Sequence, residues 1–198
     1  MSITAKATSV ESNPVEVGVH IGVCTRIIDL GSQYNEKFDL TQHKIMLTWE
    51  VADDMIEVDG EMKPKMISKE YTLSLSDKAN LRRDLEAWRG KAFSDTELMG
   101  FDLINVLGKT CQLQVLQNDR GYAYIGSIMA LPKGTPAVEP ATQTIYFDLE
   151  NKSCLTIIDN LPTWISDKIK ASPEYSKLVS NDNEFSEILD DTDDDLPF

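Results

Sequence analysis

Basic and aromatic side chains are interleaved through the middle of this chain, from about residue 26 to residue 133. Cationic groups neutralise phosphates and flat rings stack on bases, each stack contributing about 1–3 kcal/mol. A mixture of this kind is typical of a surface that holds a single strand of nucleic acid. The residues that we expect to contact such a strand are Arg26, Lys44, Lys69, Tyr71, Arg82, Arg89, Arg120, Tyr122 and Tyr124.

Two of these residues also have a simple structural role. Tyr71 shares its strand face with Ile67 and Leu73, so its ring could pack in a core instead of on the surface. Arg82 precedes Glu86 by four residues, which is the spacing of an ion pair on the surface of a helix. The sequence leaves both roles open for each residue.

The aromatic residues fall into two groups according to the residues that share their strand face or helical stripe. Tyr122 and Tyr124 are two apart and alternate with Ile125, which favours a surface position for both rings. Trp49 shares its face with apolar neighbours, and Trp88 lies on an apolar helical stripe. We expect both tryptophans in the core.

Patterns that could support catalysis or bind a metal are weak. The chain has no Gly-rich phosphate loop, no G-x-S-x-G and no H-E-x-x-H, and its three cysteines have no metal-ligand spacing. The acidic group Asp53, Asp54, Asp59 and Glu61 surrounds an Asp-Gly turn signal, which is more typical of a solvated hairpin loop. We therefore expect no enzymatic activity, no metal and no cofactor.

The elements that would position these residues follow from periodicity. Alternating apolar and polar residues predict five strands, over residues 16–29, 43–51, 66–75, 110–117 and 122–132. A helix is expected from Ser76 as N-cap to Gly90, and a capping box at Ser94 and Glu97 predicts a second short helix to about Leu107. Three strands, a helical crossover and two strands is the element order of the five-stranded OB-fold barrel, so we expect a mainly β fold of this type.

Two details of these elements are also predicted. The first strand alternates Val17, Val19, Ile21 and Val23 with smaller or polar residues, which predicts that these four side chains are buried. An added strand is expected at 144–149. A helix capped by Asn160 follows, with Trp164, Ile165 and Ile169 as its docking face.

Composition divides the chain into four parts. We expect an N-terminal arm over 1–15, the OB-fold domain over 16–133, a linker and partly structured extension over 134–178, and a disordered acidic tail over 179–198. The tail carries eight acids and no Lys or Arg, too polar a composition to order itself.

The tail also contains apolar residues that a purely solvating segment would not need. Its last residues read DDTDDDLPF, and a terminal Phe beside carboxylates suits an apolar pocket with a basic rim. The expected partner-binding tip is Asp193, Asp194, Asp195, Leu196, Pro197 and Phe198.

The tip DDDLPF resembles the C-terminus of bacterial single-stranded DNA-binding proteins, in which the tip recruits replication, recombination and repair proteins. The body is similar instead to a family of bacteriophage OB-fold single-strand binders, through HKIMLTWEV, ISKEYTLSLSDKANLRRDLEAWRG, GFDLINVLGKTCQLQV and LPKG. The resemblance spans roughly His43 to Gly134 and implies an OB fold and a single-stranded DNA ligand. Residues 144–170 look partly ordered, unlike the flexible linker of the bacterial proteins. We therefore expect a monomer or dimer in preference to a tetramer.

Together these patterns predict a phage protein that binds single-stranded DNA without strong sequence preference during replication, recombination or repair. Widely spaced cysteines and the absence of a membrane-spanning run place it in the cytoplasm of the infected bacterium. The net charge of −14 opposes DNA binding. It leaves open two other functions: an acidic DNA mimic or host-protein inhibitor, and an OB module used for protein–protein assembly.

Overall fold

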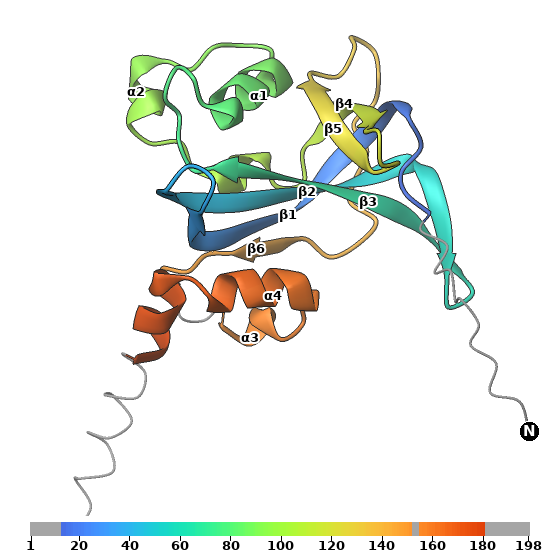
Figure 1. The fold of residues 1–198 in the computed structure, drawn as a ribbon. Coiled ribbons are helices and arrows are strands. Elements are labelled where there is room, and N and C mark those ends of the chain that lie inside the picture. Colours follow the sequence, from blue (N-terminus) through green and yellow to red (C-terminus); the bar gives the residue numbers. More distant parts are fainter. Residues whose placement is uncertain (1–12, 152–154, 181–198) are drawn as a thin grey trace, which may run out of the picture.

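One six-stranded sheet forms the centre of the protein (Figure 1). The computed structural model describes residues 13–151 and 155–180. The strands are β1 (Gly18–Asn35), β2 (Leu40–Val58), β3 (Glu61–Thr72), β4 (Thr110–Gln117), β5 (Ala123–Met129) and β6 (Ile145–Phe147). The first five pair in the order β3-β2-β1-β4-β5, all antiparallel, and β6 pairs with β1 in parallel. The prediction of a mainly β fold is therefore confirmed.

The two ends of this strand order approach each other without joining. β3 and β5 lie in contact, yet within the described residues no ladder of hydrogen bonds connects them. The sheet curls around a core but is not closed. The sequence predicts a closed OB barrel. The described residues form a curled, mainly β sheet, and closure of the barrel is not observed in them.

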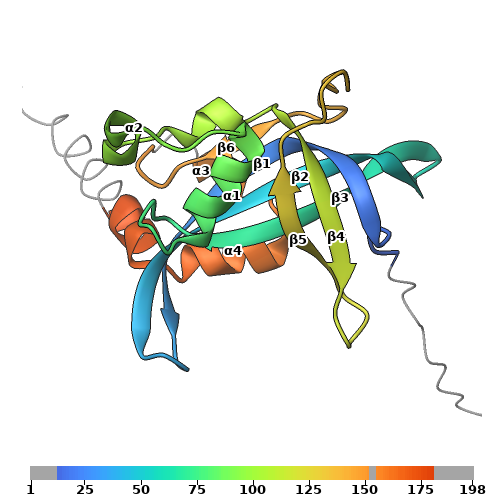
Figure 2. The same cartoon turned by 90° about the horizontal axis from the view of Figure 1, so that it is seen from above.

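The first two hairpins are longer than the sequence predicts. β1 has 18 residues and β2 has 19, so the β1–β2 hairpin extends well beyond the curled part of the sheet (Figure 2). The β2–β3 hairpin turns at Asp59 and Gly60, with φ angles of 54° and 80°. Two consecutive positive φ angles are the geometry that favours Asp-Gly in a two-residue turn, so this turn signal is confirmed.

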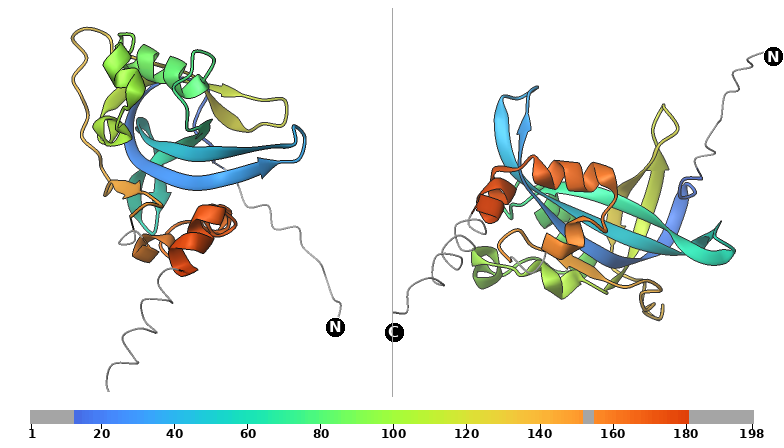
Figure 3. Two further views of the ribbon diagram at one scale, coloured as in Figure 1. Left: turned by 90° about the vertical axis from the view of Figure 1, so that its left-hand side faces the viewer. Right: turned by 90° about the horizontal axis from the view of Figure 1, so that it is seen from below.

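Helices cover both sides of the sheet (Figure 1). On one side lie α1 (Asn80–Arg89), α2 (Asp95–Met99) and the 3-10 turn η1 (Leu103–Val106). On the other side lie α3 (Leu155–Ile158) and α4 (Thr163–Lys170), followed by helical residues 173–180 (Figure 3).

The capping signals of the first helices are confirmed in part. Ser94 and Glu97 form the expected capping box at the start of α2. Ser76 is not the N-cap of α1, because the helix begins later, with Ala79 in the cap position. The predicted helix to Leu107 is also wrong, since α2 ends at Met99 and the Asp102 side chain then accepts a hydrogen bond from Ile104 N that starts η1.

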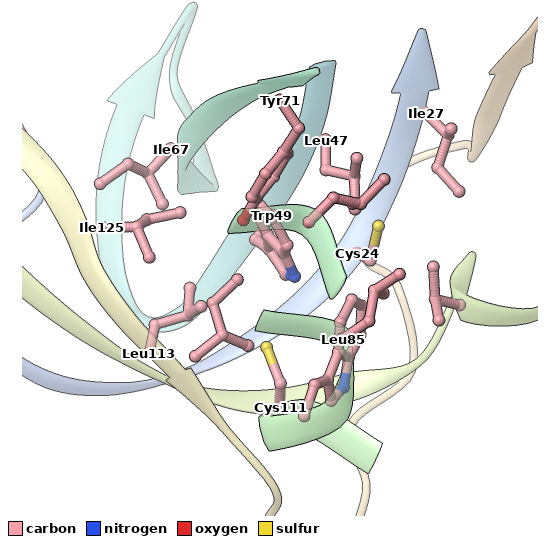
Figure 4. Packing of buried hydrophobic residues seen from close by; sticks show 14 of the residues in the cluster. Cys24, Ile27, Leu47, Trp49, Ile67, Tyr71, Leu85, Cys111, Leu113 and Ile125 are labelled. Carbon is pink, nitrogen blue, oxygen red and sulfur yellow. The ribbon is translucent and has the colours of Figure 1, made fainter. Parts of the chain in front are cut away.

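The inner core lies between the curled sheet and α1 (Figure 4). Trp49 and Trp88 are 0% and 6% exposed, with ring centroids 5.9 Å apart, as expected for core residues. The Trp88 Nε1 hydrogen bonds to Thr110 O at 3.0 Å, which satisfies its one donor. The stripe of Leu81, Leu85 and Trp88 is buried in this core, and α1 contacts β3 and β5, the two ends of the strand order.

The predicted burial of the first strand is wrong at its beginning. Val17 and Val19 are 59% and 56% exposed, whereas His20 on the opposite face is buried. Gly22 explains the choice of face, because a Cβ there would lie 2.5 Å from Leu113 Cδ1 in the core. Gly22 has no side chain, so the Leu113 side chain fills the space next to it, and the face of β1 that carries Gly22 is the one that faces the core.

A second core lies on the outer face of β1 and β2. Here Ile28 and Met46 pack with Phe147 of β6 and with Ile165 and Ile169 of α4. The added strand and these two docking isoleucines are confirmed. The N-cap of α4 is Pro162 and not Asn160.

Trp164 does not dock as the sequence predicts. It is 51% exposed, because Ile165 and Ile169 fill the interface and Trp164 lies on a different face of α4. Residues 1–12 of the expected arm and 181–198 of the expected tail lie outside the described residues.

Candidate nucleic-acid interface

Two hairpins project from the same side of the molecule (Figure 2). One is the β1–β2 hairpin with its tip at residues 35–40, and the other is the β4–β5 hairpin with its tip at residues 117–123. The views from above and below both show the tips separated by the width of the sheet (Figures 2 and 3). The two hairpin tips thus lie on one side of the molecule, one on either flank of the sheet.

The β1–β2 tip exposes two aromatic rings beside a cation. Tyr34 and Phe38 are 60% and 68% exposed, and Lys37 Nζ lies 5.4 Å from the Phe38 ring centroid. The Tyr34 hydroxyl donates to Asp39 Oδ1 at 2.8 Å, and this hydrogen bond raises the pKa of Tyr34. Neither ring belongs to the predicted contact set, although an aromatic–lysine cluster in a polar connection marks them in the sequence.

The β4–β5 tip holds three of the predicted contact residues together. Asn118 Oδ1 accepts hydrogen bonds from the backbone amides of Arg120 and Tyr122, both at 3.0 Å, which fixes the turn. Tyr122 and Tyr124 are 66% and 45% exposed, and Arg120 is exposed at the tip. The expected surface position of both tyrosines is confirmed.

Lys44 lies on the outer face of β2, paired with Gly31 of β1 and with Thr72 of β3. Its Nζ donates to Gln42 Oε1 at 2.9 Å and to Thr72 Oγ1 at 2.7 Å, and the described residues give it no ion pair. A cavity of about 330 Å³ opens beside it, lined mainly by polar groups. Lys44 therefore keeps its positive charge available for an anion.

Tyr71 cannot serve the role predicted for it. It is 3% exposed, and its hydroxyl donates to Asp84 Oδ2 at 3.0 Å in the interior. Burial, and secondarily the Asp84 charge, raise the pKa of Tyr71 well above its usual range. The prediction that this ring stacks on a base is wrong, because both faces of the ring lie inside the protein.

Three predicted cationic contacts are engaged in ion pairs. Lys69 Nζ lies 2.8 Å from Asp84 Oδ2, Arg82 Nε lies 3.0 Å from Glu86 Oε1, and Arg89 pairs with Glu97. Since each cation is already neutralised by a carboxylate, its attraction for a phosphate is weakened. The alternative structural role of Arg82 is therefore realised.

Arg26 is the remaining member of the predicted set. It lies on β1 opposite Ile145 of β6, it is half-buried, and its Nε is buried without a hydrogen-bond partner. The structure does not bring Arg26 together with the projecting hairpins. The predicted tip Asp193, Asp194, Asp195, Leu196, Pro197 and Phe198 lies outside the described residues.

The described ranges contain neither a metal-ligand cluster nor a membrane-spanning helix, and their free cysteines are buried. Over residues 13–151 and 155–180, no group of three His, Cys, Asp or Glu side chains is placed to hold a metal ion. No helix in the same ranges has the length and apolar character to span a membrane. Cys24 and Cys111 are buried free thiols, and burial raises the pKa of Cys24 to about 12.

Comparison with known proteins adds no relative. No protein-family model matches the chain, and no curated protein sequence matches it significantly.

Proposed function

We propose that this protein binds single-stranded DNA without strong sequence preference, in phage replication, recombination or repair. The observation that carries the proposal is the pair of hairpins on one side of the sheet. The β1–β2 tip exposes two aromatic rings with Lys37 over one of them, and the β4–β5 hairpin exposes two more rings and Arg120. The strand order places these tips at the β1–β2 and β4–β5 connections. Those two loops, with the face of strands 2 and 3, are where OB folds bind oligonucleotides, which supports an OB-type assignment.

The chemistry of the two hairpin tips suits a flexible strand. Tyr34, Phe38, Tyr122 and Tyr124 offer faces on which any base can stack, and stacking tolerates sequence because every base has a π-face. Lys37, Lys44 and Arg120 supply charges for phosphates. A surface built from rings and cations has few groups that read base edges, so we expect weak sequence preference.

The β4–β5 tip provides the test of this proposal. Replacing Arg120, Tyr122 and Tyr124 together by Ala removes two stacking faces and one cation, and we expect the affinity for labelled oligo-dT to fall roughly 30-fold or more. Fluorescence anisotropy at low salt measures this directly. The thermal unfolding temperature should stay close to wild type, because all three side chains are exposed.

The matched control is the double variant Tyr122→Phe/Tyr124→Phe, which keeps both rings and should bind oligo-dT nearly as well as wild type. If the triple-alanine variant binds oligo-dT with unchanged affinity, the β4–β5 tip does not contact the DNA.

For the acidic tip we propose a role in recruiting replication or recombination proteins, motivated by its apolar residues among carboxylates. Deleting Asp190–Phe198 should abolish binding to a replication partner and leave oligo-dT affinity unchanged or higher. A collapse of oligo-dT affinity after this deletion would show that the tail has a different role.

A further inference from the structure

Helix α4 lies across the outer face of the sheet in a fixed direction. Its C-terminal end is tied to the β1–β2 hairpin, since Gln33 Nε2 donates to Lys168 O at 3.0 Å. Just beyond it, Glu174 accepts hydrogen bonds from the Ser32 amide and hydroxyl at 2.8 and 2.6 Å. The N-terminal end of α4 therefore points away from this hairpin (Figure 3).

The hydrogen bonds between Glu174 and Ser32 hold the C-terminal end of α4 against the β1–β2 hairpin at neutral pH. Burial alone would raise the pKa of the Glu174 carboxyl, but the two hydrogen bonds from Ser32, the Glu174 backbone amide and the His43 charge together outweigh it and lower the pKa below its usual range. Glu174 is consequently ionised at pH 7 and accepts both bonds.

Trp164 stands at the free N-terminal end of α4 with its ring toward solvent. It is 51% exposed, whereas Trp49 and Trp88 are 0% and 6% exposed. Lys168, one turn later on the same face, places Nζ 5.7 Å from the Trp164 ring centroid. A stacking face and an ammonium group thus lie side by side on one helix.

An uncovered strip of β3 lies next to this pair. Met66, Ser68 and Glu70 alternate on the outer face of β3, and all three are exposed. Lys168 forms an ion pair with Glu70, which fixes α4 against one side of the strip. β5 contacts β3 from the other side and carries Tyr124.

The packing of α4 does not account for an exposed tryptophan. Ile165 and Ile169 make its contact with the second core, and both are buried. Trp164 lies outside that core, so the docking of α4 does not require a large aromatic ring there. Trp164 is instead linked to the β3 strip through Lys168, which lies against its ring and pairs with Glu70.

We propose that Trp164 and Lys168 extend the single-strand-binding surface across β3 onto the C-terminal extension. A base stacks on Trp164, and a phosphate replaces Glu70 as the partner of Lys168. The inference rests on the proposed function and adds a segment that lies outside the five antiparallel strands β1 to β5. The ligand is a single DNA strand that runs from the β4–β5 hairpin over β3 to α4.

Intrinsic fluorescence of the full-length protein reports on this residue, because Trp164 is the one exposed tryptophan among the three in the chain. We expect oligo-dT to quench wild-type fluorescence. In Trp164→Phe the quenching should disappear while anisotropy with labelled oligo-dT still shows binding close to wild type. In Trp164→Ala the affinity should fall roughly 5- to 150-fold, the range of one base–aromatic stack.

Two further variants separate stacking from general effects. Met99→Ala removes a 91% exposed side chain from α2, on the other side of the sheet, and should change neither signal. Glu70→Gln frees Lys168 and should raise oligo-dT affinity.

Three results would overturn the inference, and the third would overturn the proposed function as well. Quenching that persists in Trp164→Phe, or Trp164→Ala affinity equal to wild type, overturns it while single-strand binding stands. A wild-type protein that gives no anisotropy change with oligo-dT at low salt overturns the proposed function itself, and the inference with it.

Discussion

Asp84 is buried and accepts hydrogen bonds from Lys69 and Tyr71, two residues that the sequence predicts to contact DNA. Its side chain is 6% exposed and accepts from Lys69 at 2.8 Å and from the Tyr71 hydroxyl at 3.0 Å. Arg83 adds hydrogen bonds to the other oxygen at 3.1 Å. A buried carboxylate needs such partners, because an ion removed from water is costly unless it is paired.

Replacing Asp84 by Ala should therefore destabilise the protein strongly. The change leaves the buried Tyr71 hydroxyl and the Lys69 ammonium without their acceptor, at a cost of about 2–4 kcal/mol in the free energy of unfolding. Urea denaturation followed by tryptophan fluorescence measures this loss.

The matched control is Asp77→Ala, which removes a carboxylate that is 90% exposed and paired with Arg82. It should change the free energy of unfolding by no more than about 0.5 kcal/mol. Equal losses in the two variants would mean that the Asp84 network does not stabilise the fold.

The sequence predicts single residues well where one local pattern decides. Tyr122 and Tyr124 alternate with buried Ile125, and this is sufficient to place them on the surface. Tyr71 could not be placed in this way, since its burial depends on Asp84, which lies on a helix and reaches it only through the fold. Trp164 was misplaced because neighbouring isoleucines satisfy the docking of α4 without it.

At the scale of elements, a close approach at Gly31 joins β1 to the C-terminal extension. Gly31 has a φ of 68°, and a Cβ built on it would lie 2.5 Å from the Cβ of Ser172. Ser172 is itself buried, and its hydroxyl donates to Ile169 O at 2.7 Å and accepts from Tyr175 N at 3.2 Å. The β1 backbone and the turn after α4 are thus held together at a position that only glycine fits.

We expect Gly31→Ala to destabilise the extension. The left-handed backbone costs a residue with a side chain about 1–2 kcal/mol, and forcing Ser172 aside adds about 1–3 kcal/mol. Gly60→Ala is the matched control, because Gly60 has a φ of 80° but nothing within 4 Å of its built Cβ. Gly60→Ala should show the backbone cost alone when the free energies of unfolding are compared by urea denaturation.

Similar losses for the two glycine variants would contradict a tight contact at Gly31. Protection of the amides in residues 173–180 from hydrogen exchange should fall in Gly31→Ala and stay unchanged in Gly60→Ala.

The existence and type of the main elements followed from the sequence, but their ends and partners did not. Period-two patterns gave β4 and β5 with nearly their observed bounds, Thr110–Gln117 and Ala123–Met129. They missed the length of β1 and β2 mainly at residues 34–41 and 55–58, which are largely exposed at hairpin ends and have no buried face to impose alternation. Coverage of the outer face by α4 depends on contacts between residues more than a hundred positions apart, such as Met46 and Ile165.

At the scale of the whole molecule, charge is the strongest argument against DNA binding. The net charge is −14, and eight of the acids lie within residues 179–198. In the described residues, Lys69, Arg82 and Arg89 are neutralised by carboxylates. Binding must therefore come from a few local cations and from stacking, which predicts a moderate dependence on salt.

The measurement that tests this account most directly is the titration of labelled oligo-dT with the full-length protein, followed by anisotropy at increasing salt. Four candidate cations (Lys37, Lys44, Arg120 and Lys168) predict saturable binding at low salt, with a slope of about −3 in log affinity against log salt. No binding at the lowest salt would contradict single-strand binding as the function of this protein.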